Sequence, residues 1–248
     1  MNRVNYALMD PTGNRTVLVT TPVPPAQRPA VAAALMAAEP TAEQLGFVTA
    51  GEAPALTMAG GEFCGNASMA AAALLRPQGG RVLLRVSGTP APVPVEITPA
   101  PGGWRGRVAM PLPLRIGVRE LPSLGSVPVV ELPGITHIPL TAPLDRAAAE
   151  ALIRPLCRQL AAPALGLLLT DGKSRMTPLV YVPAADTLFW ESSCASGTAA
   201  VGAWQQALLG TPVRLTLQQP AGSLTVEADG SCLWLSGTVR KLYETPGI

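Results

Sequence analysis

Short aliphatic runs separated by prolines and glycines dominate the chain, and this pattern predicts many strands and few helices. Strands are predicted at Asn14–Thr21, Phe47–Thr49, Leu56–Ala59 and Leu179–Val182. Two helices are predicted at Arg28–Ala38, which Pro40 ends, and at Asp145–Leu160, with Asp145 as the N-cap. Strands with a few interspersed helices indicate the α+β fold class.

A second feature of the pattern is that it occurs twice. Cys64 and Cys194 lie 130 positions apart, and each precedes a run of small residues that predicts a helix. Two strands and then a tryptophan follow in both copies. The paired segments are the helices Ala67–Leu75 and Thr198–Leu209, the strands Val82–Val86 and Val213–Leu217, the strands Val95–Ile97 and Val226–Ala228, and Trp104 with Trp234. One order of elements at one offset predicts duplicated halves that fold as two similar lobes.

The composition is that of a folded protein without an extended charged surface. Of the 248 residues, 48% are hydrophobic and 14% charged, which suffices for one large domain or two smaller ones. The 18 basic and 16 acidic residues are scattered singly, so neither a nucleic-acid stripe nor a polybasic membrane patch is predicted. The N-terminus lacks a signal-peptide core, and no apolar run approaches the ~18 residues that span a bilayer. We therefore expect a cytoplasmic protein with reduced cysteines and no nucleic-acid or membrane partner.

The counts of chemically active residues exclude several kinds of site. His137 is the only histidine, so a histidine-rich metal site is impossible and any Ser-His-Asp triad would have to include this residue. No CxxC pair of the zinc-binding kind occurs. Lys173 and Lys241 are the only possible anchors for pyridoxal phosphate, and neither lies in a cofactor-binding loop. We expect no metal and no cofactor.

The two duplicated cysteines carry the candidate chemistry. A helix N-terminus has unpaired N–H groups and a partial positive charge, so it binds a carboxylate and lowers the pKa of a cysteine placed there. The small residues after Cys64 and Cys194 leave the backbone open to a ligand. Equivalent sites of duplicated halves can meet across a cleft, where one thiolate would remove the α-proton of an amino acid and one thiol would protonate the opposite face. Such a pair inverts the stereocentre.

Other interpretations of the cysteines remain open. A free cysteine most often acts as a small buried hydrophobic residue, and we assign that role to Cys157, on a helical face, and to Cys232, in a predicted strand. For Cys64 and Cys194 the duplicated context favours function instead. The alternatives are a thiol redox pair and an amino-acid-binding protein that has the cleft without the catalysis.

Two motifs identify the family that the chain resembles. Glu62-Phe63-Cys64-Gly65-Asn66 resembles the ExCGN motif of diaminopimelate epimerases, and Ser193-Cys194-Ala195-Ser196-Gly197 resembles their second motif, usually ACG[ST]G. Thr12-Gly13-Asn14 resembles the N-terminal GN strand, and Thr136-His137 matches the histidine of the NPH segment. The resemblance covers nearly the whole chain. The cysteine spacing fits this family better than the longer proline racemases, and phenazine-pathway isomerases of the same fold usually lack the cysteine pair.

The resemblance implies two pseudo-symmetric lobes with the active site in the cleft between them. The N-terminal lobe would comprise residues 1–116 and 238–248, because the tail resembles a strand that returns to it, and the C-terminal lobe residues 117–237. The implied activity is cofactor-independent racemisation or epimerisation by Cys64 and Cys194, and the implied assembly is a homodimer. Asn14 and the backbone amides of Gly65, Asn66, Ala195 and Ser196 would bind the substrate. His137 would either support the site from behind or be a hydrogen-bonded core residue.

Departures from the family pattern concern the substrate. Pro183-Ala184-Ala185-Asp186 has no arginine where diaminopimelate epimerases carry an ERG segment, and Ala55–Met58 lacks their asparagine, so the clamp for a distal amino-carboxylate is missing. Ala195 replaces a usual glycine, which a negative φ tolerates. Glu191, beside Trp190, either faces a substrate amine or imidazole or is only a favourable charge near a helix N-terminus. Short relatives without the clamp include histidine racemases, so histidine is the predicted substrate, with diaminopimelate and proline or hydroxyproline as alternatives.

Overall fold

Buried and exposed side chains alternate along the strands that follow the duplicated helices. In β5 (Gly80–Val86) Val82, Leu84 and Val86 are buried, and β15 (Gly222–Ala228) repeats the same alternation. A period of two is typical of a sheet with one face on a core.

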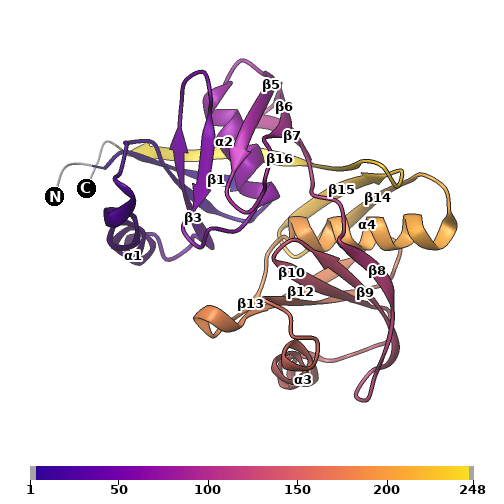
Figure 1. Cartoon of the computed structure of the whole chain (residues 1–248). Coiled ribbons are helices and arrows are strands. Elements are labelled where there is room, and N and C mark those ends of the chain that lie inside the picture. The colour runs from indigo at the N-terminus through magenta and orange to yellow at the C-terminus, as the bar shows by residue number, and fades with distance from the viewer. Residues whose placement is uncertain (1–3, 246–248) are drawn as a thin grey trace. The chain divides into compact units, whose positions relative to one another are not determined.

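The computed structural model describes residues 4–245 (Figure 1).

The described residues divide into two units. Unit 1 comprises residues 4–109 and 236–245, and unit 2 comprises Met110–Leu235. The corresponding boundaries expected from the family resemblance are 116/117 and 237/238. The chain thus leaves unit 1 once and returns to it through its last strand.

Unit 1 is a sheet that closes around a helix. Its strand order is β1-β2-β3-β4-β5-β6-β7-β16, and β1 also pairs antiparallel with β16, which joins the two ends of the series. Helix α2 (Gly65–Leu75) packs against β1, β2, β5, β6 and β7, and every residue from Gly65 to Ala73 is buried. Helix α1 (Arg28–Ala38) packs against β3 and buries only Leu35. The remaining strands are β1 (Tyr6–Pro11), β2 (Thr16–Val19), β3 (Gln44–Thr49), β4 (Ala55–Met58), β6 (Val93–Ala100), β7 (Gly103–Ala109) and β16 (Leu233–Thr245).

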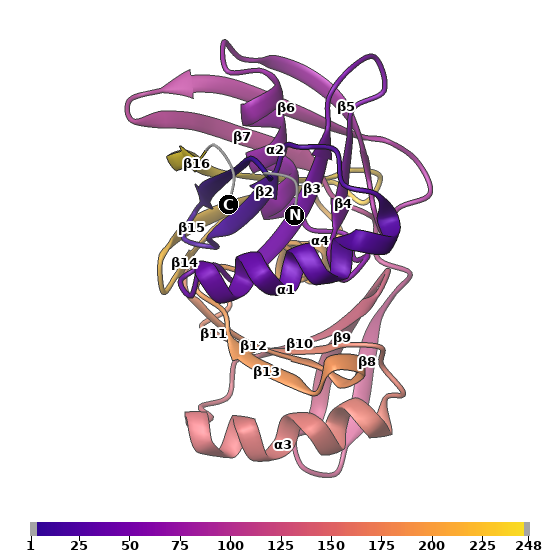
Figure 2. The same cartoon turned by 90° about the vertical axis from the view of Figure 1, so that its left-hand side faces the viewer.

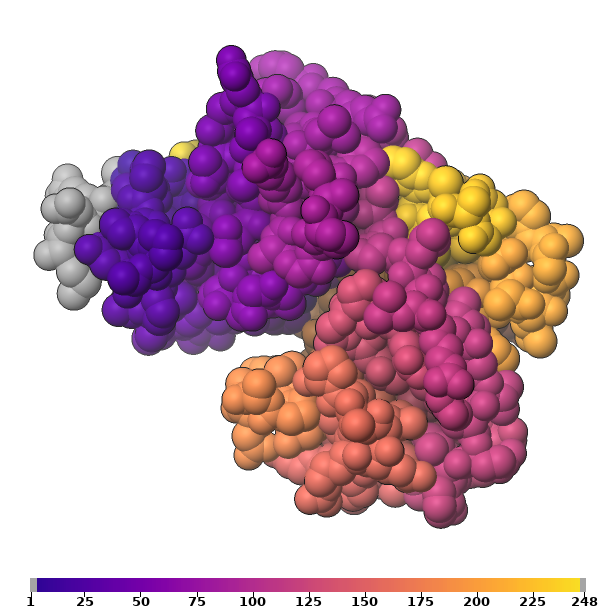
Figure 3. All heavy atoms as spheres, in the orientation of Figure 1, coloured from indigo at the N-terminus to yellow at the C-terminus, as the bar shows by residue number. Residues whose placement is uncertain are grey.

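Unit 2 contains a six-stranded sheet with a helix on each face. The order is β13-β12-β11-β10-β9-β8, in which only the β10–β11 pair is parallel. Helix α4 (Ala195–Leu209) packs against this sheet and against the β14–β15 hairpin, while α3 (Arg146–Gln159) covers the other face (Figure 2). The outer strand β8 lies at the surface (Figure 3), where Val118 is exposed. The strands are β8 (Arg115–Leu121), β9 (Gly125–Leu132), β10 (Ile135–Leu140), β11 (Leu165–Thr170), β12 (Met176–Val182), β13 (Thr187–Trp190) and β14 (Val213–Gln219).

The four predicted helices are confirmed, and the fold class is α+β. Asp145 is the N-cap of α3, and its Oδ1 accepts a hydrogen bond from the N–H of Ala148 at 2.8 Å. The predicted strands also form, several of them longer than the sequence indicated. The strand predicted at Asn14–Thr21 is shorter, because β2 comprises only Thr16–Val19. None of the helices within residues 4–245 has both the length and the apolar character needed to cross a bilayer.

Candidate active site

Cys64 is the N-cap of α2. Its backbone is extended, with φ −130° and ψ 114°, and its Sγ accepts a hydrogen bond from the N–H of Ala67 at 3.4 Å. The hydroxyl of Ser68 donates to the carbonyl oxygen of Cys64 at 2.6 Å. Because both the sulfur and the carbonyl are tied to the first turn, the half-buried thiol lies in the positive field of the helix start.

A chain of polar side chains reaches the Cys64 sulfur from β3. The amide Nε2 of Gln44 lies 3.1 Å from Sγ and 3.2 Å from the Thr16 hydroxyl, and it also donates to Oδ1 of Asn14. Asn14 donates from Nδ2 to the Glu43 carboxylate at 2.6 Å. The structure therefore places the buried Asn14 behind Gln44, and its contact with substrate stays a prediction.

Cys194 repeats the geometry of Cys64 at the start of α4. It is an extended N-cap with φ −115° and ψ 110°, and its Sγ accepts a hydrogen bond from the N–H of Gly197 at 3.2 Å. The Thr198 hydroxyl donates to the Cys194 carbonyl oxygen at 2.7 Å, as Ser68 does in the first copy. Unlike Cys64, Cys194 is only 3% exposed.

A buried glutamine holds the main chain of Cys194. Oε1 of Gln219, at the end of β14, accepts from the Cys194 N–H at 2.8 Å, and its Nε2 donates to the Thr198 hydroxyl at 2.8 Å. Sequence reasoning missed both Gln219 and Gln44, because each lies on a strand far along the chain from the cysteine it contacts. Only the pairing of strands around the central helices brings them together.

His137 lies behind Ser196 rather than at the Cys194 sulfur. Its Nε2 is 2.9 Å from Ser196 Oγ, which is 3.5 Å from Cys194 Sγ. Complete burial lowers the pKa of His137 to about 3, so the imidazole is neutral at pH 7. Nδ1 has no hydrogen-bond partner among residues 4–245 and packs against Gly166 of the neighbouring strand. An unpaired buried N–H is the costlier choice, so the favoured tautomer carries its proton on Nε2 and donates it to Ser196.

Glu191 lies beside Cys194 and opposes its ionisation. Burial raises the pKa of the Cys194 thiol well above its ordinary value, and the negative charge of Glu191 and a hydrogen bond with it act in the same direction. Hydrogen bonds from Ser196 and Gly197 lower the pKa but do not outweigh burial. The position at a helix start predicted a lowered pKa, and for Cys194 that prediction is wrong because desolvation exceeds the effect of the helix.

Trp190 belongs to the packing of α3. Its Nε1 donates to the Glu150 carboxylate at 2.5 Å, and the Arg146 guanidinium lies over its ring at 4.5 Å. Successive residues at a strand end point to opposite faces, so Trp190 faces α3 while Glu191 faces Cys194. The two neighbours therefore have different surroundings, although they are adjacent in the sequence.

The first turns of α2 and α4 contain the four residues whose backbone amides the resemblance assigned to the substrate carboxylate. N–H groups in a first turn have no partner within their own helix and point out of its start. Ala195 is buried and helical, and it is not among the residues with positive φ, so the alanine at this position is tolerated as expected. Carboxylate binding by these amides stays a prediction. The residues are Gly65, Asn66, Ala195 and Ser196.

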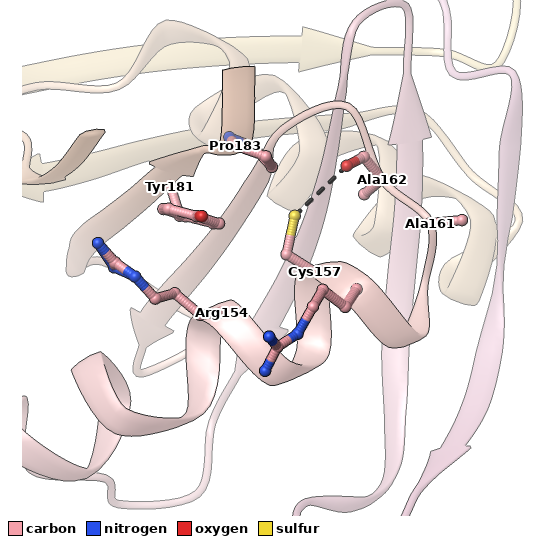
Figure 4. A pocket seen from close by; sticks show the side chains of 7 residues that line it. Arg154, Cys157, Ala161, Ala162, Tyr181 and Pro183 are labelled. Atoms are coloured by element: carbon pink, nitrogen blue, oxygen red, sulfur yellow. Dashed lines mark hydrogen bonds between the residues drawn. The ribbon is translucent and has the colours of Figure 1, made fainter. Parts of the chain in front are cut away.

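The other cysteines are not equivalent to these two. Cys157 is a core residue of α3, as predicted, and its thiol donates to the Ala162 carbonyl oxygen at 3.3 Å beside a hollow of about 390 Å³ (Figure 4). Arg154 lines the same hollow, where it stacks on Tyr181 at 4.6 Å and pairs with Asp186 at 2.9 Å. Cys232 is exposed and precedes β16, so its assignment to a buried strand position is wrong. The Asp229 carboxylate accepts the Cys232 N–H at 2.7 Å and holds this residue in a turn.

A metal site needs several ligating side chains close together. Across residues 4–245 no group of three or more histidine, cysteine, aspartate or glutamate residues has such an arrangement.

Comparison with known proteins gives consistent sequence matches. A family model described as the histidine racemase CntK N-terminal domain matches residues 3–238. The histidine racemase of Staphylococcus aureus (strain Mu50) is 30% identical to this chain, over 91% of the chain and 89% of its own length. A histidine racemase of Fusobacterium nucleatum is 28% identical, over 82% of the chain and 80% of its own length.

Solved structures show the same fold at low sequence identity. A PhzF-family phenazine biosynthesis protein from Bacillus anthracis superposes with a TM-score of 0.72 at 12% identity, covering 99% of each chain. A hydroxyproline epimerase from Agrobacterium vitis, with bound trans-4-hydroxy-L-proline, gives a TM-score of 0.69 at 10% identity, covering 98% of this chain and 91% of its own. At such identities the likeness establishes the fold alone.

Proposed function

The chain belongs to the family of the histidine racemase CntK N-terminal domain and is a racemase or epimerase, and from this premise we propose that it inverts the α-carbon of histidine with Cys64 and Cys194 as the acid/base pair. The observation that carries the proposal is the duplicated N-cap. Each unit places one cysteine at the start of its central helix, with a backbone N–H directed at the sulfur. A structural cysteine would not need this geometry twice.

In the proposed reaction one sulfur is a thiolate and the other a thiol. The thiolate accepts the α-proton and becomes a thiol, while the electron pair of the broken C–H bond stays on the α-carbon. The second thiol gives its proton to the opposite face of that carbon and becomes the thiolate. The product is the enantiomer, and the number of protons on enzyme and substrate together is unchanged. The first-turn N–H groups of the two helices would bind the carboxylate and stabilise the negative charge that develops beside it.

Histidine is proposed as substrate because the family model and the matching curated relatives carry that name. The missing arginine at Pro183–Ala185 supports the choice, since a second carboxylate on the side chain would lack its partner. The scheme uses no pyridoxal phosphate. The enzyme is proposed to act on a free small amino acid, and nucleic acid and membranes have no part in the reaction.

Loss of the α-proton signal in D₂O, followed by proton NMR, tests the proposal directly. The fully reduced protein is incubated with L-histidine, D-histidine, other common amino acids, proline, hydroxyproline and diaminopimelate. Exchange with both enantiomers of histidine is expected, and Cys64→Ser and Cys194→Ser should each abolish inversion. The matched control is Lys173→Met with Lys241→Met, which removes both lysines and should leave the rate unchanged.

The outcomes separate the alternatives. Exchange with diaminopimelate or proline in place of histidine would refute the substrate but keep the mechanism. Loss of activity in the double lysine variant would point to a lysine-bound cofactor instead. Binding of histidine without exchange, unaffected by either cysteine substitution, would identify an amino-acid-binding protein.

A further inference from the structure

We propose that Gln44 is a positioning residue whose side-chain amide donates a hydrogen bond to the Cys64 sulfur. Cys64, rather than Cys194, is therefore the thiolate of the resting enzyme. The catalytic meaning of this inference rests on the proposed function. The protonation states themselves are a property of the free protein and are measurable without any substrate.

The orientation of the Gln44 amide follows from the end of its hydrogen-bonded chain. Glu43 is exposed, and the oxygens of its carboxylate accept hydrogen bonds. The Asn14 atom 2.6 Å from it must therefore be the donor Nδ2, which turns Oδ1 of Asn14 toward Gln44. Oδ1 is an acceptor, so Gln44 presents its Nε2, and the same NH₂ group lies 3.1 Å from Cys64 Sγ.

The hydrogens of Gln44 Nε2 favour a charged sulfur. The NH₂ group has two hydrogens and three acceptors within reach, namely Asn14 Oδ1, Thr16 Oγ1 and Cys64 Sγ. The carbonyl of Asn14 takes one, and a thiolate competes for the other better than a neutral hydroxyl does, because a bond to an ionised acceptor is about twice as strong. The N–H of Ala67 is a further donor to the same sulfur. These donors stabilise the thiolate form of Cys64.

Cys194 has surroundings of the opposite kind. It is 3% exposed, and the two strongest influences on it, burial and the charge of Glu191, both favour the neutral thiol. Ser196 and the Gly197 N–H donate to the sulfur but do not reverse that balance. His137 stands behind Ser196 as a neutral ring and adds no charge.

Two acidic side chains, Glu43 and Glu62, lie near Cys64 in the sequence or in its hydrogen-bonded network. Glu43 is hydrogen-bonded to Asn14, which accepts from Gln44, and the carboxylate of Glu62 lies against Gly60. The duplicated caps thus share their main-chain geometry and differ in the side chains added to it. With Cys64 as base and Cys194 as acid, the resting enzyme is prepared for the enantiomer whose α-proton faces Cys64.

The test is peptide-resolved alkylation of the reduced protein by iodoacetamide across pH 5–10, followed by mass spectrometry, since only the thiolate reacts. The midpoint of each pH profile reports ionisation, whereas the plateau rate reports access. We expect the midpoint of Cys64 below that of Cys194. In Gln44→Met the midpoint of Cys64 should rise by about one pH unit, which corresponds to roughly tenfold slower alkylation at pH 7. The midpoint of Cys194 should stay the same. Gln44→Glu, which replaces the donor by a charged acceptor of equal size, should raise it further.

Thr16→Val is the matched control, because it removes another hydrogen bond of Gln44 but keeps the donor on the sulfur. It should leave the Cys64 midpoint unchanged or slightly lower, because it also removes an acceptor that competes with the sulfur for Gln44 Nε2, and it should not raise the midpoint. Two results would overturn the inference. One is a Cys64 midpoint that is the same in wild type and in a folded Gln44→Met protein. The other is a wild-type protein in which the midpoint of Cys194 is below that of Cys64. If both Gln44 variants fail to fold, the order of the two wild-type midpoints still decides it. Should α-proton exchange be absent while these midpoints hold, the proposed function fails and the assignment of the thiolate stands.

Discussion

The clamp formed by Gln219 leads to a stability prediction with a closely matched control. In Gln219→Leu the side chain keeps most of its volume but loses both polar atoms, so the buried N–H of Cys194 has lost its acceptor. The Thr198 hydroxyl loses the hydrogen bond that it accepts, although it still donates to the Cys194 carbonyl. Leaving a buried donor unpaired costs about 1–3 kcal/mol, and the second bond adds about 1 kcal/mol. We expect the free energy of unfolding to fall by about 2–4 kcal/mol.

The control is the neighbouring Gln218→Leu. Gln218 also makes two hydrogen bonds, donating to the Gln219 carbonyl oxygen at 3.0 Å and accepting from Ser223 at 2.6 Å, but it is exposed. Water replaces those partners, so the change should stay within about 0.5 kcal/mol. Both variants are compared with wild type by urea denaturation and by thermal melting, where the loss in Gln219→Leu corresponds to roughly 4–16 °C.

A double-substitution cycle identifies the mechanism. If Gln219 acts through Thr198 and Cys194, then Thr198→Val combined with Gln219→Leu should cost less than the two separate losses added together. Two results would refute the reasoning that a buried clamp holds this N-cap. One is an equal loss of unfolding free energy in Gln219→Leu and Gln218→Leu. The other is full additivity of the losses in Gln219→Leu and Thr198→Val.

Two further predictions concern the same unit. A Cβ on Gly197 would lie 2.8 Å from Leu168 Cδ2 and 3.1 Å from Cys194 Sγ. Gly197→Ala should therefore lower the free energy of unfolding in urea by about 1–3 kcal/mol and reduce the rate of α-proton exchange. An unchanged exchange rate would contradict this prediction. His137 has a lowered pKa of about 3 when folded, against an ordinary value of 6.5, so the unfolded chain binds more protons than the folded one between these values. Stability should therefore fall as the pH drops below about 6.5, by up to about 1.4 kcal/mol per pH unit from this group, and His137→Gln should remove that part of the slope in urea titrations at stepped pH.

The local parts of the site were predictable because they are encoded locally. The run of small residues after each cysteine predicted a helix that starts there, and both Cys64 and Cys194 are N-caps. Asp145 could be identified as an N-cap for the same reason. The duplication extended this inference from one helix to two, so the sequence alone selected both sulfurs.

The supporting residues could not be selected in this way. Gln44 and Gln219 are unremarkable glutamines in the sequence, and their contacts with Cys64 and Cys194 depend on which strand lies beside each central helix. The same applies to the separation of Trp190 from Glu191. Strand pairing between distant segments is a property of the whole unit, and no short motif records it.

The sequence by itself determined the fold class, the duplication, the family and the position of each cysteine at a helix start, because these follow from periodicity, capping and motif. Tertiary structure alone decided the electrostatic character of each sulfur. A helix start favours a thiolate at both positions, but dense packing of unit 2 buries Cys194 beside Glu191, and desolvation reverses the direction of its pKa. Burial depends on every element that surrounds a side chain, so two similar motifs acquire different chemistry only when the chain is folded.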